Sequence, residues 1–392
     1  MDPGTLEGLG RALAAEGRIG VGCTPVQAAE SLAQAVRGGI TAAGGQALRL
    51  KLDSPVQCAG AGVQLGLPAV LYVEEERGRI SLYLFGADGL PPQGELLRRL
   101  EAAWNGEVPI LSEEVAPGRE ADAGLTCQDW AAWTAERARL RRPALRRVTA
   151  AVGRATAQDR AIRAALTAMG CTLEESWRPG IPAFRGERGG FGLTARDERG
   201  VVVDSGQLLA VLVLIEMENG AGRAAVSPGA SAAAELVASG YGGTVLRLGR
   251  DGTEARRLAA AQPWMGQAPA AAVRLCSRMA VAGQRLERLV AKTPRFSAWR
   301  REVPLAAGGD QVLSALAEAP GSRREGPGLR LRTGDGWVYL SPANRRPILR
   351  VLAEGPDLEL AAELCDRFAH WAAQVDRELS GRCAQEEDKQ AP

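Results

Sequence analysis

The stretch RIGVGCTPVQAAESLAQAVRGGITAAGGQALRLKL (18–52) decides the fold class of this 392-residue chain. RIGVG (18–22) is a short apolar run typical of a strand, and ALRLKL (47–52) is a second one. Between them, apolar residues recur at helical spacing, with Thr24 as a candidate N-cap and Pro25 at the first helical position. The stretch therefore predicts a strand, a helix and a second strand, the repeating unit of an α/β fold.

The same alternation continues along the chain. Further strands are predicted at 68–75, 79–86, 148–152, 223–228 and 243–249. Further helices are predicted at 56–66, 93–104, 157–170, 207–218, 231–240 and 268–290. Two strand-like runs and a helix follow near the C-terminus, at 329–342, 348–355 and 357–379. We therefore expect an α/β protein that contains mixed sheets.

The chain is longer than a single hydrophobic core usually supports, so several compact units are expected. An arginine-rich segment at 137–147 marks the first boundary. We predict domains at 1–140, 141–206, 207–305 and 306–380, followed by a polar tail at 381–392.

Composition and net charge exclude several classes of protein. Hydrophobic residues make up 46% and charged residues 24%, which is typical of a globular protein and excludes global disorder. The net charge of +2 gives no general attraction to nucleic acid or membrane, so we expect neither as a partner. For 137–147, an exposed helix face is favoured over nucleic-acid binding, because no aromatic residues separate the arginines. Neither a signal-like segment nor a membrane-length apolar stretch is found, which predicts a cytoplasmic location.

Cysteine and histidine usage argues against metal knuckles and histidine-based catalysis. The single histidine, His370, lies in an apolar helical stretch, where packing or solvent exposure is expected. The cysteines are far apart, which favours buried, reduced thiols. They are Cys23, Cys58, Cys127, Cys171, Cys276, Cys365 and Cys383.

Five segments, taken in order, resemble the α-D-phosphohexomutase family of phosphoglucomutases, phosphomannomutases and phosphoglucosamine mutases. They are GGITAAGGQALRL (38–50), FGADGLP (85–91), RGVVVDSGQLLAVLVLIE (199–216), LERLVAKTPRFSAWRREVPL (286–305) and GDGWVYLSPANRRPILRVLAEGPDLELAAEL (334–364). The resemblance implies three similar mixed-sheet α/β domains, the second shortened, plus a smaller α+β C-terminal domain around a central cleft. One helical segment of the second domain is expected to be absent.

The family's chemistry depends on four loops, and the first carries a phosphorylated serine in a segment that reads TASHNP. The corresponding stretch here, LYVEEERGRIS (71–81), holds Glu74, Glu75 and Glu76 and no hydroxyl at the expected place. Ser81 lies nearby but fits a strand position. Three carboxylates repel an incoming phosphosugar, so the nucleophile loop is interpreted as degenerate. For the glutamates themselves, a solvated turn is the simpler interpretation.

The second loop binds Mg²⁺ in the family through aspartates in a DxDxDR segment. The resemblance places Thr194, Arg196 and Glu198 at those positions, followed by Arg199. Divalent cations require several carboxylate oxygens, so we expect no tightly bound metal or other cofactor. A weak site at Asp197 and Glu198 stays open, although ion pairs with Arg196 or Arg199 are simpler.

The third loop recognises the sugar in the family through a GExSG pattern. The corresponding stretch here offers Gln262, Trp264 and Gln267, which could stack on and hydrogen-bond a sugar. Packing of the Pro-Trp-Met turn against the protein is the alternative interpretation.

The fourth loop binds phosphate in the family, and SPANRRP (341–347) is similar to its RxSxTxP pattern. Ser341, Asn344, Arg345 and Arg346 could hold an anion together with backbone amides. Two exposed arginines on a turn are the alternative.

The degenerate loops together favour a pseudoenzyme that lacks mutase activity and binds a phosphosugar or a protein. A protein partner could be a second copy or a true phosphohexomutase. The alternative hypothesis is a divergent mutase of carbohydrate metabolism with relocated catalytic residues, which would need Mg²⁺.

Overall fold

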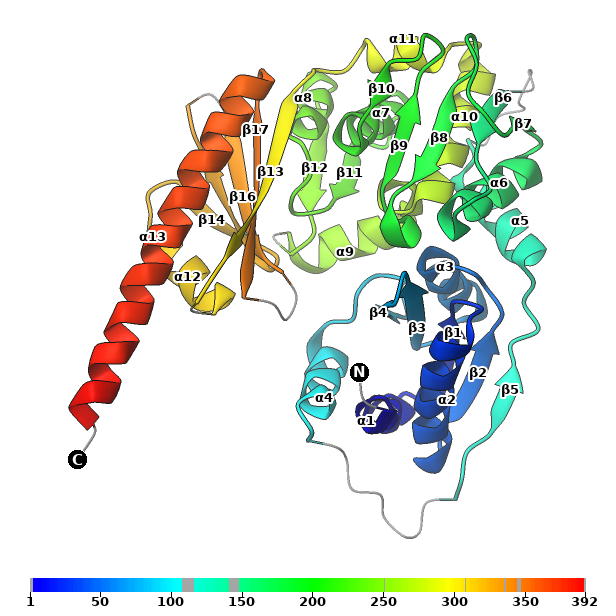
Figure 1. Ribbon diagram of the computed structural model, residues 1–392. Coiled ribbons are helices and arrows are strands. Elements are labelled where there is room, and N and C mark those ends of the chain that lie inside the picture. Colours follow the sequence, from blue (N-terminus) through cyan, green and yellow to red (C-terminus); the bar gives the residue numbers. More distant parts are fainter. Residues whose placement is uncertain are drawn as a thin grey trace. The chain divides into compact units, whose positions relative to one another are not determined.

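The computed structural model describes residues 3–107, 116–140, 148–249, 251–306, 308–334, 336–343 and 347–390, with side chains up to 381 in the C-terminal helix (Figure 1). The chain forms two compact units. Unit 1 contains Met1–Ser205 and Gly266–Glu287, and unit 2 contains Gly206–Met265 and Arg288–Pro392. The finer division into four domains stays a prediction.

The first sheet of unit 1 confirms the predicted alternation of strands and helices. Its order is β4-β3-β1-β2-β5, with β1 parallel to both β2 and β3, and β4 antiparallel to β3. The strands are β1 Arg18–Cys23, β2 Gln46–Leu50, β3 Ala69–Glu76, β4 Arg79–Gly86 and β5 Glu120–Asp122. One hydrophobic cluster packs α1 Pro3–Ala14, α2 Gln27–Ala42 and α4 Gly94–Trp104 on this sheet. A second cluster packs α3 Pro55–Leu65 and α5 Cys127–Ala138.

Alternation within β1 explains this arrangement. Ile19 and Val21 are fully buried in the cluster with α1 and α2. Gly20 and Gly22 alternate with these residues and face the opposite side of the sheet, which α3 covers. A Cβ atom on Gly22 would lie 2.6 Å from the Cys58 Sγ atom of α3. The two glycines therefore let α3 pack closely on the centre of the sheet.

The second sheet of unit 1 repeats the first. Its order is β10-β9-β8-β6-β7, and the β9-β8-β6-β7 portion has the parallel and antiparallel pairings of β4-β3-β1-β2. The elements are β6 Thr149–Val152, α6 Ala157–Met169, β7 Thr172–Glu174, β8 Ala183–Gly186, η1 Arg188–Gly190, β9 Leu193–Arg196 and β10 Val202–Val203. The described residues 175–182, between β7 and β8, contain no helix. The second α/β repeat is therefore shortened, as predicted.

A helix from later in the chain belongs to the same unit. α10 Ala268–Ala282 packs against α5, α6, β8 and β9. The predicted helix 268–290 is not continuous, because Gly283 adopts a left-handed conformation (φ 61°) and ends α10. α11 Leu286–Val290 is a separate short helix.

Unit 2 begins with a further strand-helix-strand arrangement. β11 and β12 are parallel, and the buried faces of α7 and α8 pack against them in one cluster. The elements are α7 Ser205–Glu218, β11 Arg223–Val226, α8 Ala232–Gly240, β12 Thr244–Arg247, α9 Gly252–Ala261 and η2 Pro263–Met265.

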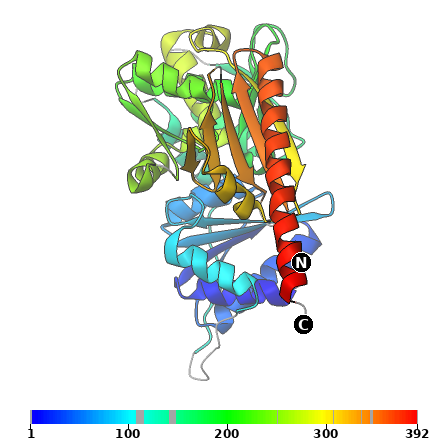
Figure 2. The ribbon, with the colours of Figure 1, turned by 90° about the vertical axis from the view of Figure 1, so that its left-hand side faces the viewer.

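An antiparallel sheet completes unit 2, in the order β13-β17-β16-β15-β14. α13 lies along this sheet (Figure 2), and its apolar side chains share a core with α12 and the strands. The elements are β13 Ser297–Pro304, α12 Gly309–Leu316, β14 Ser322–Glu325, β15 Gly328–Arg332, β16 Trp337–Pro342, β17 Ile348–Gly355 and α13 Leu358–Gln390. α13 continues into the segment expected as a polar tail. Across the described ranges, no helix combines the length and apolar character needed to cross a bilayer.

Candidate functional site

The stretch 71–81, where the resemblance places the family's serine segment, forms a tight hairpin. β3 continues to Glu76 and β4 begins at Arg79, so only Arg77 and Gly78 make the turn. Both have positive φ angles, of 55° and 77°, which is typical of a two-residue hairpin turn. Such a turn extends no loop beyond the sheet. The stretch interpreted as a degenerate nucleophile loop therefore consists of continuous strand pairing.

Glu74 lies in strand β3 and is buried, so the interpretation as a solvated turn does not apply to this residue. Its Oε2 atom accepts a hydrogen bond from the Tyr83 hydroxyl at 2.9 Å. Burial, and then the Glu74 carboxylate, raise the pKa of Tyr83. The Arg188 Nε atom lies 3.4 Å from the same Glu74 oxygen. Glu74 is thus held by two neighbouring groups.

Arg188 connects the hairpin to the second sheet of unit 1. Its Nη2 atom donates to the Ser81 Oγ atom at 3.0 Å, and its Nε atom lies 3.4 Å from Glu76 Oε2. Ser81 pairs directly with Glu74 across the strands. A phosphate on Ser81 would therefore lie among carboxylates, with one guanidinium to offset the repulsion.

Glu75 and Thr24 have local structural roles. The Glu75 side chain accepts a hydrogen bond from the Gly78 N–H at 2.6 Å, across the turn. Thr24 is not the N-cap of α2, which is Val26. Its hydroxyl instead accepts from the Glu75 N–H at 3.1 Å, because Thr24 directly follows the neighbouring strand β1.

The stretch that the resemblance places at the metal loop is also a hairpin, between β9 and β10. Asp197 Oδ1 accepts hydrogen bonds from the backbone N–H groups of Arg199 and Val201, both at 2.9 Å. Glu198 is buried, and its two oxygens accept from the N–H groups of Leu286 and Glu287 at 2.8 and 3.0 Å. Glu198 therefore caps the start of α11.

The arginines of this hairpin have other partners than expected. Arg199 pairs with Glu287 at 2.5 Å, and the Arg196 guanidinium lies over the Trp177 ring at 5.4 Å. Thr194 donates to the Arg185 carbonyl at 3.4 Å. The expectation that Asp197 and Glu198 form ion pairs with Arg196 or Arg199 was therefore wrong, because backbone N–H groups donate hydrogen bonds to both carboxylates. Among the described residues, no group of three or more His, Cys, Asp or Glu is arranged to hold a metal ion.

The predicted sugar-binding residues lie in different units. Gln262 is buried, and its amide accepts from the Ala225 N–H at 3.0 Å and donates to the Arg223 carbonyl at 3.1 Å. Gln262 therefore pairs with strand β11 as a neighbouring strand would. Trp264 is buried in the same unit, whereas Gln267 precedes α10 in unit 1. Sugar binding by these residues stays a prediction.

Of the predicted anion loop, only the flanks are described. Ser341 is half-buried in β16 and pairs with Arg350 of β17. Asn344, Arg345 and Arg346 lie outside the described residues. The anion site therefore also stays a prediction.

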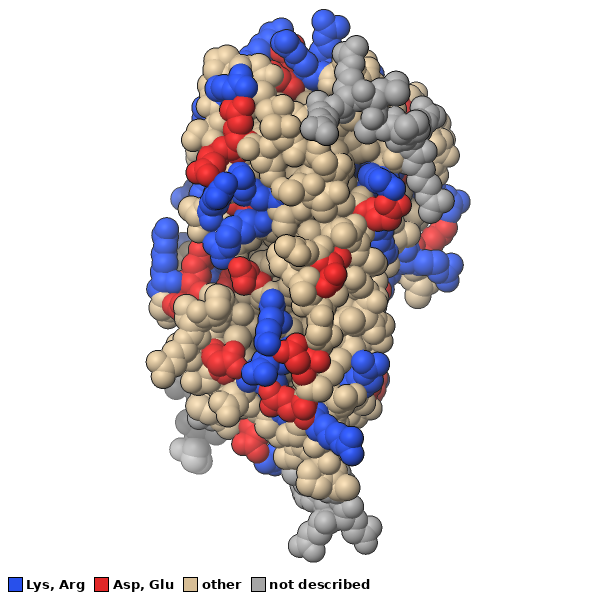
Figure 3. Space-filling model, turned by 90° about the vertical axis from the view of Figure 1, so that its right-hand side faces the viewer, with Lys and Arg blue, Asp and Glu red and all other residues tan. Residues whose placement is uncertain are grey.

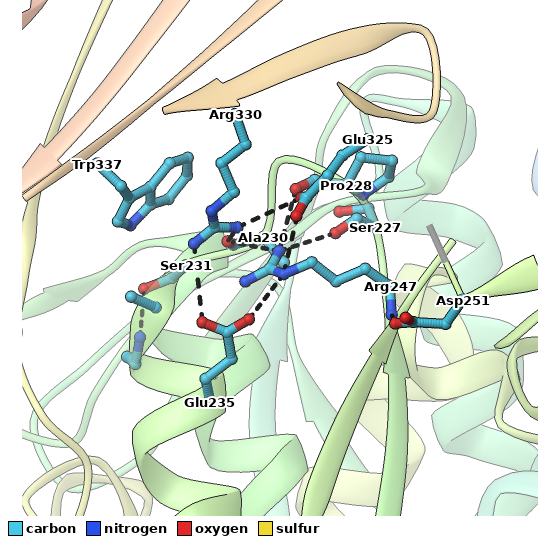
Figure 4. Close-up of polar contacts among 12 residues, drawn as sticks. Ser227, Pro228, Ala230, Ser231, Glu235, Arg247, Asp251, Glu325, Arg330 and Trp337 are labelled. Carbon is cyan, nitrogen blue, oxygen red and sulfur yellow. Dashed lines mark hydrogen bonds and ion pairs between the residues drawn. The ribbon is translucent and has the colours of Figure 1, made fainter. Parts of the chain in front are cut away.

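A buried charge cluster in unit 2 was not predicted from the sequence (Figure 4). The Arg247 side chain is fully buried, and its Nε atom donates to Glu235 at 2.9 Å. Its Nη1 atom donates to the Pro228 and Ala230 carbonyls, both at 3.0 Å. The Glu325 carboxylate, also buried, lies 3.9 Å from Arg247 Nε. The cluster joins α8 and β12 to β14.

Arg330 extends this cluster into the C-terminal sheet. Its guanidinium lies 3.8 Å from Glu325 and stacks over the Trp337 ring at 4.0 Å. Burial, and then the neighbouring charge of Arg247, lower the pKa of Arg330 to about 10. The only signal in the sequence is that Arg330 alternates with the buried residues Leu329 and Leu331.

The exposed charges are mixed in sign. Figure 3 shows lysine and arginine interspersed with aspartate and glutamate on the face that it draws. Examples of exposed pairs elsewhere in the described residues are Arg154 with Glu175 and Arg350 with Glu302. This pattern agrees with the small net charge of the chain.

No protein-family model and no curated protein sequence matches the chain, whereas solved structures do. A phosphoglucomutase/phosphomannomutase family protein from Burkholderia thailandensis matches with a TM-score of 0.69 at 15% identity, covering 95% of this chain and 94% of that chain. A putative phosphomannomutase from Thermus thermophilus matches with a TM-score of 0.66 at 14% identity, covering 97% and 95%. The Paramecium phosphoglucomutase pp63/parafusin matches with a TM-score of 0.57 at 10% identity, covering 95% and 91%.

These matches confirm the predicted fold class. The chain has an α-D-phosphohexomutase-like fold over nearly its full length. At this level of identity the likeness concerns the fold alone.

Proposed function

We propose that this chain is a phosphohexomutase-like protein without mutase activity, which acts by binding. The observation that carries the proposal is the β3–β4 hairpin. A two-residue turn, Arg77 and Gly78, joins the two strands in the stretch that resembles the family's serine segment. The flanking strand presents Glu74, Glu75 and Glu76.

Electrostatics supports this proposal. Phosphoryl transfer needs a phosphorylated nucleophile and cations that neutralise the developing charge. Here Glu74 and Glu76 both lie 3.4 Å from the Arg188 guanidinium. A phosphoester beside them would add negative charge that this guanidinium does not offset.

The metal-loop hairpin supports it as well. Mg²⁺ is usually held by one or two carboxylates with free oxygens and by phosphate. Both oxygens of Glu198 accept backbone hydrogen bonds, and Asp197 closes its own turn. These carboxylates already have structural partners.

The ligand class that we propose first is a hexose phosphate, because the similar structures are named as phosphoglucomutases and phosphomannomutases. The segment 341–347 is the proposed phosphate contact, on sequence grounds. A protein partner, either a second copy or an active phosphohexomutase, is the alternative ligand.

The second candidate function is a divergent phosphotransferase. One observation favours it: the Ser81 hydroxyl accepts a hydrogen bond from Arg188 at 3.0 Å, next to the position of the family's nucleophile. This enzyme would need Mg²⁺ and a phosphorylated Ser81.

A turnover assay distinguishes the two functions. Purified protein is incubated with glucose, mannose or glucosamine 1-phosphate and Mg²⁺, and the 6-phosphates are followed by ³¹P NMR. We expect no turnover above the rate without protein, and no phosphoserine in the intact mass. Turnover at roughly 1 s⁻¹ or faster that disappears in Ser81→Ala would establish the phosphotransferase instead.

Ligand binding is tested by thermal unfolding. A hexose 6-phosphate at millimolar concentration should raise the midpoint of unfolding, since it binds only the folded state. The double variant Arg345→Ala/Arg346→Ala should lose this shift, whereas Arg154→Ala, which changes an exposed arginine in unit 1, should keep it. Absence of any shift for the native protein would leave a protein partner as the ligand class.

A further inference from the structure

Two cysteines that lie far apart in the sequence meet inside unit 1. Cys171 directly follows α6, whose C-cap Gly170 has a left-handed φ of 93°. The Cys171 N–H donates to the Leu166 carbonyl at 3.0 Å, and the next residue, Thr172, begins β7. The backbone of Cys171 is therefore fixed on both sides, while its side chain stays partly exposed.

Cys276 approaches from α10, which packs against α6. It is fully buried. Its helix is anchored at neighbouring positions, because Arg274 donates to the Ala138 carbonyl at 3.2 Å and the Ser277 hydroxyl accepts from the Leu140 N–H at 2.9 Å. The Cys171 and Cys276 thiols are hydrogen-bonded to each other. Two rigid backbones thus hold the sulfur atoms in contact.

The two thiols differ in character. The hydrogen bond from Cys276 lowers the pKa of Cys171, whereas the same bond and burial raise the pKa of Cys276. By contrast, partial burial of the Cys127 side chain raises the pKa of its thiol. A partly exposed thiol beside a buried partner thiol is the arrangement of a peroxide-sensitive cysteine and its resolving cysteine.

We propose that Cys171 and Cys276 form a reversible intramolecular disulfide when the protein reacts with a hydroperoxide. The Cys171 thiolate attacks the hydroperoxide, the O–O bond breaks, and an alcohol or water leaves with a proton. Cys171 is then a sulfenic acid. The Cys276 sulfur attacks it, the S–O bond breaks, and the hydroxide leaves as water with the Cys276 proton. Two thiols lose two electrons in total, and the hydroperoxide gains them.

This disulfide would tie α10 covalently to the start of β7. α10 comes from much later in the chain than the second sheet on which it packs. The cross-link would therefore fix α10 on the second sheet of unit 1. The inference does not depend on the proposed binding function.

Peptide mapping of the native, full-length protein tests the proposal. The protein is treated with hydrogen peroxide, alkylated and digested without reductant. We expect a peptide pair linked through Cys171 and Cys276, which dithiothreitol separates. The oxidised protein should unfold at a midpoint higher by roughly 5 °C or more, since the cross-link closes a long loop.

Variants separate the two roles. Cys276→Ala should accumulate Cys171 sulfenic acid, which dimedone traps, and Cys171→Ser should leave Cys276 unmodified. Cys127→Ser is the matched control and should still form the disulfide. Oxidation of Cys171 in the native protein without the linked peptide would overturn the proposal. So would a disulfide that forms only between molecules.

Discussion

Single glycines determine how closely the first two helices approach each other. A Cβ atom on Gly10 of α1 would lie 2.2 Å from the Val36 carbonyl oxygen of α2. A Cβ on Gly39 of α2 would lie 2.1 Å from the Glu7 carbonyl oxygen. Both contacts involve backbone atoms, which cannot move aside as a flexible side chain can. The absence of side chains at these two positions therefore sets the helix spacing.

Neighbouring glycines in α2 provide a matched pair of substitutions. Gly39→Ala should lower the free energy of unfolding by about 2 kcal/mol or more, because the added methyl group overlaps backbone. Gly38→Ala should raise it by up to about 1 kcal/mol, since that position faces open space and alanine favours helix. Urea denaturation of both variants measures the difference. Equal effects would contradict the close packing of α1 on α2.

Burial and one neighbouring carboxylate raise the pKa of the Cys23 thiol. Its Sγ atom donates to Glu30 at 2.9 Å, and burial together with this bond and the Glu30 charge raises the pKa of Cys23 to about 12. The folded pKa lies above the ordinary value. The stabilisation from this thiol is therefore complete below the ordinary pKa, and it is lost as the pH rises towards about 12.

Removing the Glu30 charge should make Cys23 more reactive. In Glu30→Gln the pKa of Cys23 should fall. The Glu30 charge, which raises this pKa, is removed, whereas the positive charge of Arg37, which lowers it, remains. Alkylation of Cys23 by iodoacetamide at pH 9, followed by mass spectrometry, should become faster than in the native protein. Cys365 lies in unit 2 and serves as the internal control, with an unchanged rate. An unchanged rate at Cys23 would show that burial alone sets its pKa.

At the level of elements, α11 depends on a residue far away in the sequence. This helix spans Leu286–Val290 and is too short to be stable by itself. Glu198, in the β9–β10 hairpin, accepts hydrogen bonds from its first two N–H groups. A residue that the resemblance places at a metal position thus has a helix-capping role here.

Loss of this cap should destabilise the fold. Glu198→Ala should lower the free energy of unfolding by about 1–3 kcal/mol, because two buried N–H groups lose their acceptor. Glu175→Ala removes an exposed ion pair with Arg154 and should cost less than about 1 kcal/mol. Thermal unfolding with and without Mg²⁺ adds a second readout. Stabilisation by Mg²⁺ in the native protein but not in Glu198→Ala would indicate a metal ligand rather than a cap.

At the level of the whole molecule, the charge cluster of unit 2 connects segments that lie far apart in the sequence. Arg247, Glu325 and Arg330 come from β12, β14 and β15. Glu354 of β17 adds a further connection, because it accepts hydrogen bonds from Ser231 and from the Ala232 N–H. The antiparallel sheet is therefore joined to α8 and β12 within one unit.

Arg247→Met should be strongly destabilising, although it keeps the side-chain volume. The substitution removes a positive charge from a buried network, so the negative charge of Glu325 is less well neutralised. The free energy of unfolding should fall by about 3–5 kcal/mol. Arg223→Met in β11 breaks an exposed pair with Glu254 and should cost less than about 1 kcal/mol. Guanidinium denaturation compares the two variants. Similar costs would mean that the cluster contributes no more than a surface ion pair.

The sequence alone determined the fold class and the main elements of each repeat. Alternation in RIGVG and the following helical spacing reflect periods of two and 3.6 residues, which depend only on neighbouring positions. The expectation that the family's serine and metal-binding aspartates are replaced, by residues such as Glu74 and Arg196, likewise came from the sequence alone. α1 was not predicted, although Leu6, Leu9 and Leu13 have helical spacing and are fully or almost fully buried.

Only the tertiary structure decided which distant residues became partners. It showed that Glu198 caps α11, that Gln262 pairs with β11, that Cys171 meets Cys276, and that Arg247 meets Glu325. These contacts depend on how elements far apart in sequence pack together. A local sequence pattern does not predict that packing, because burial and charge pairing act between segments that come into contact only in the folded protein.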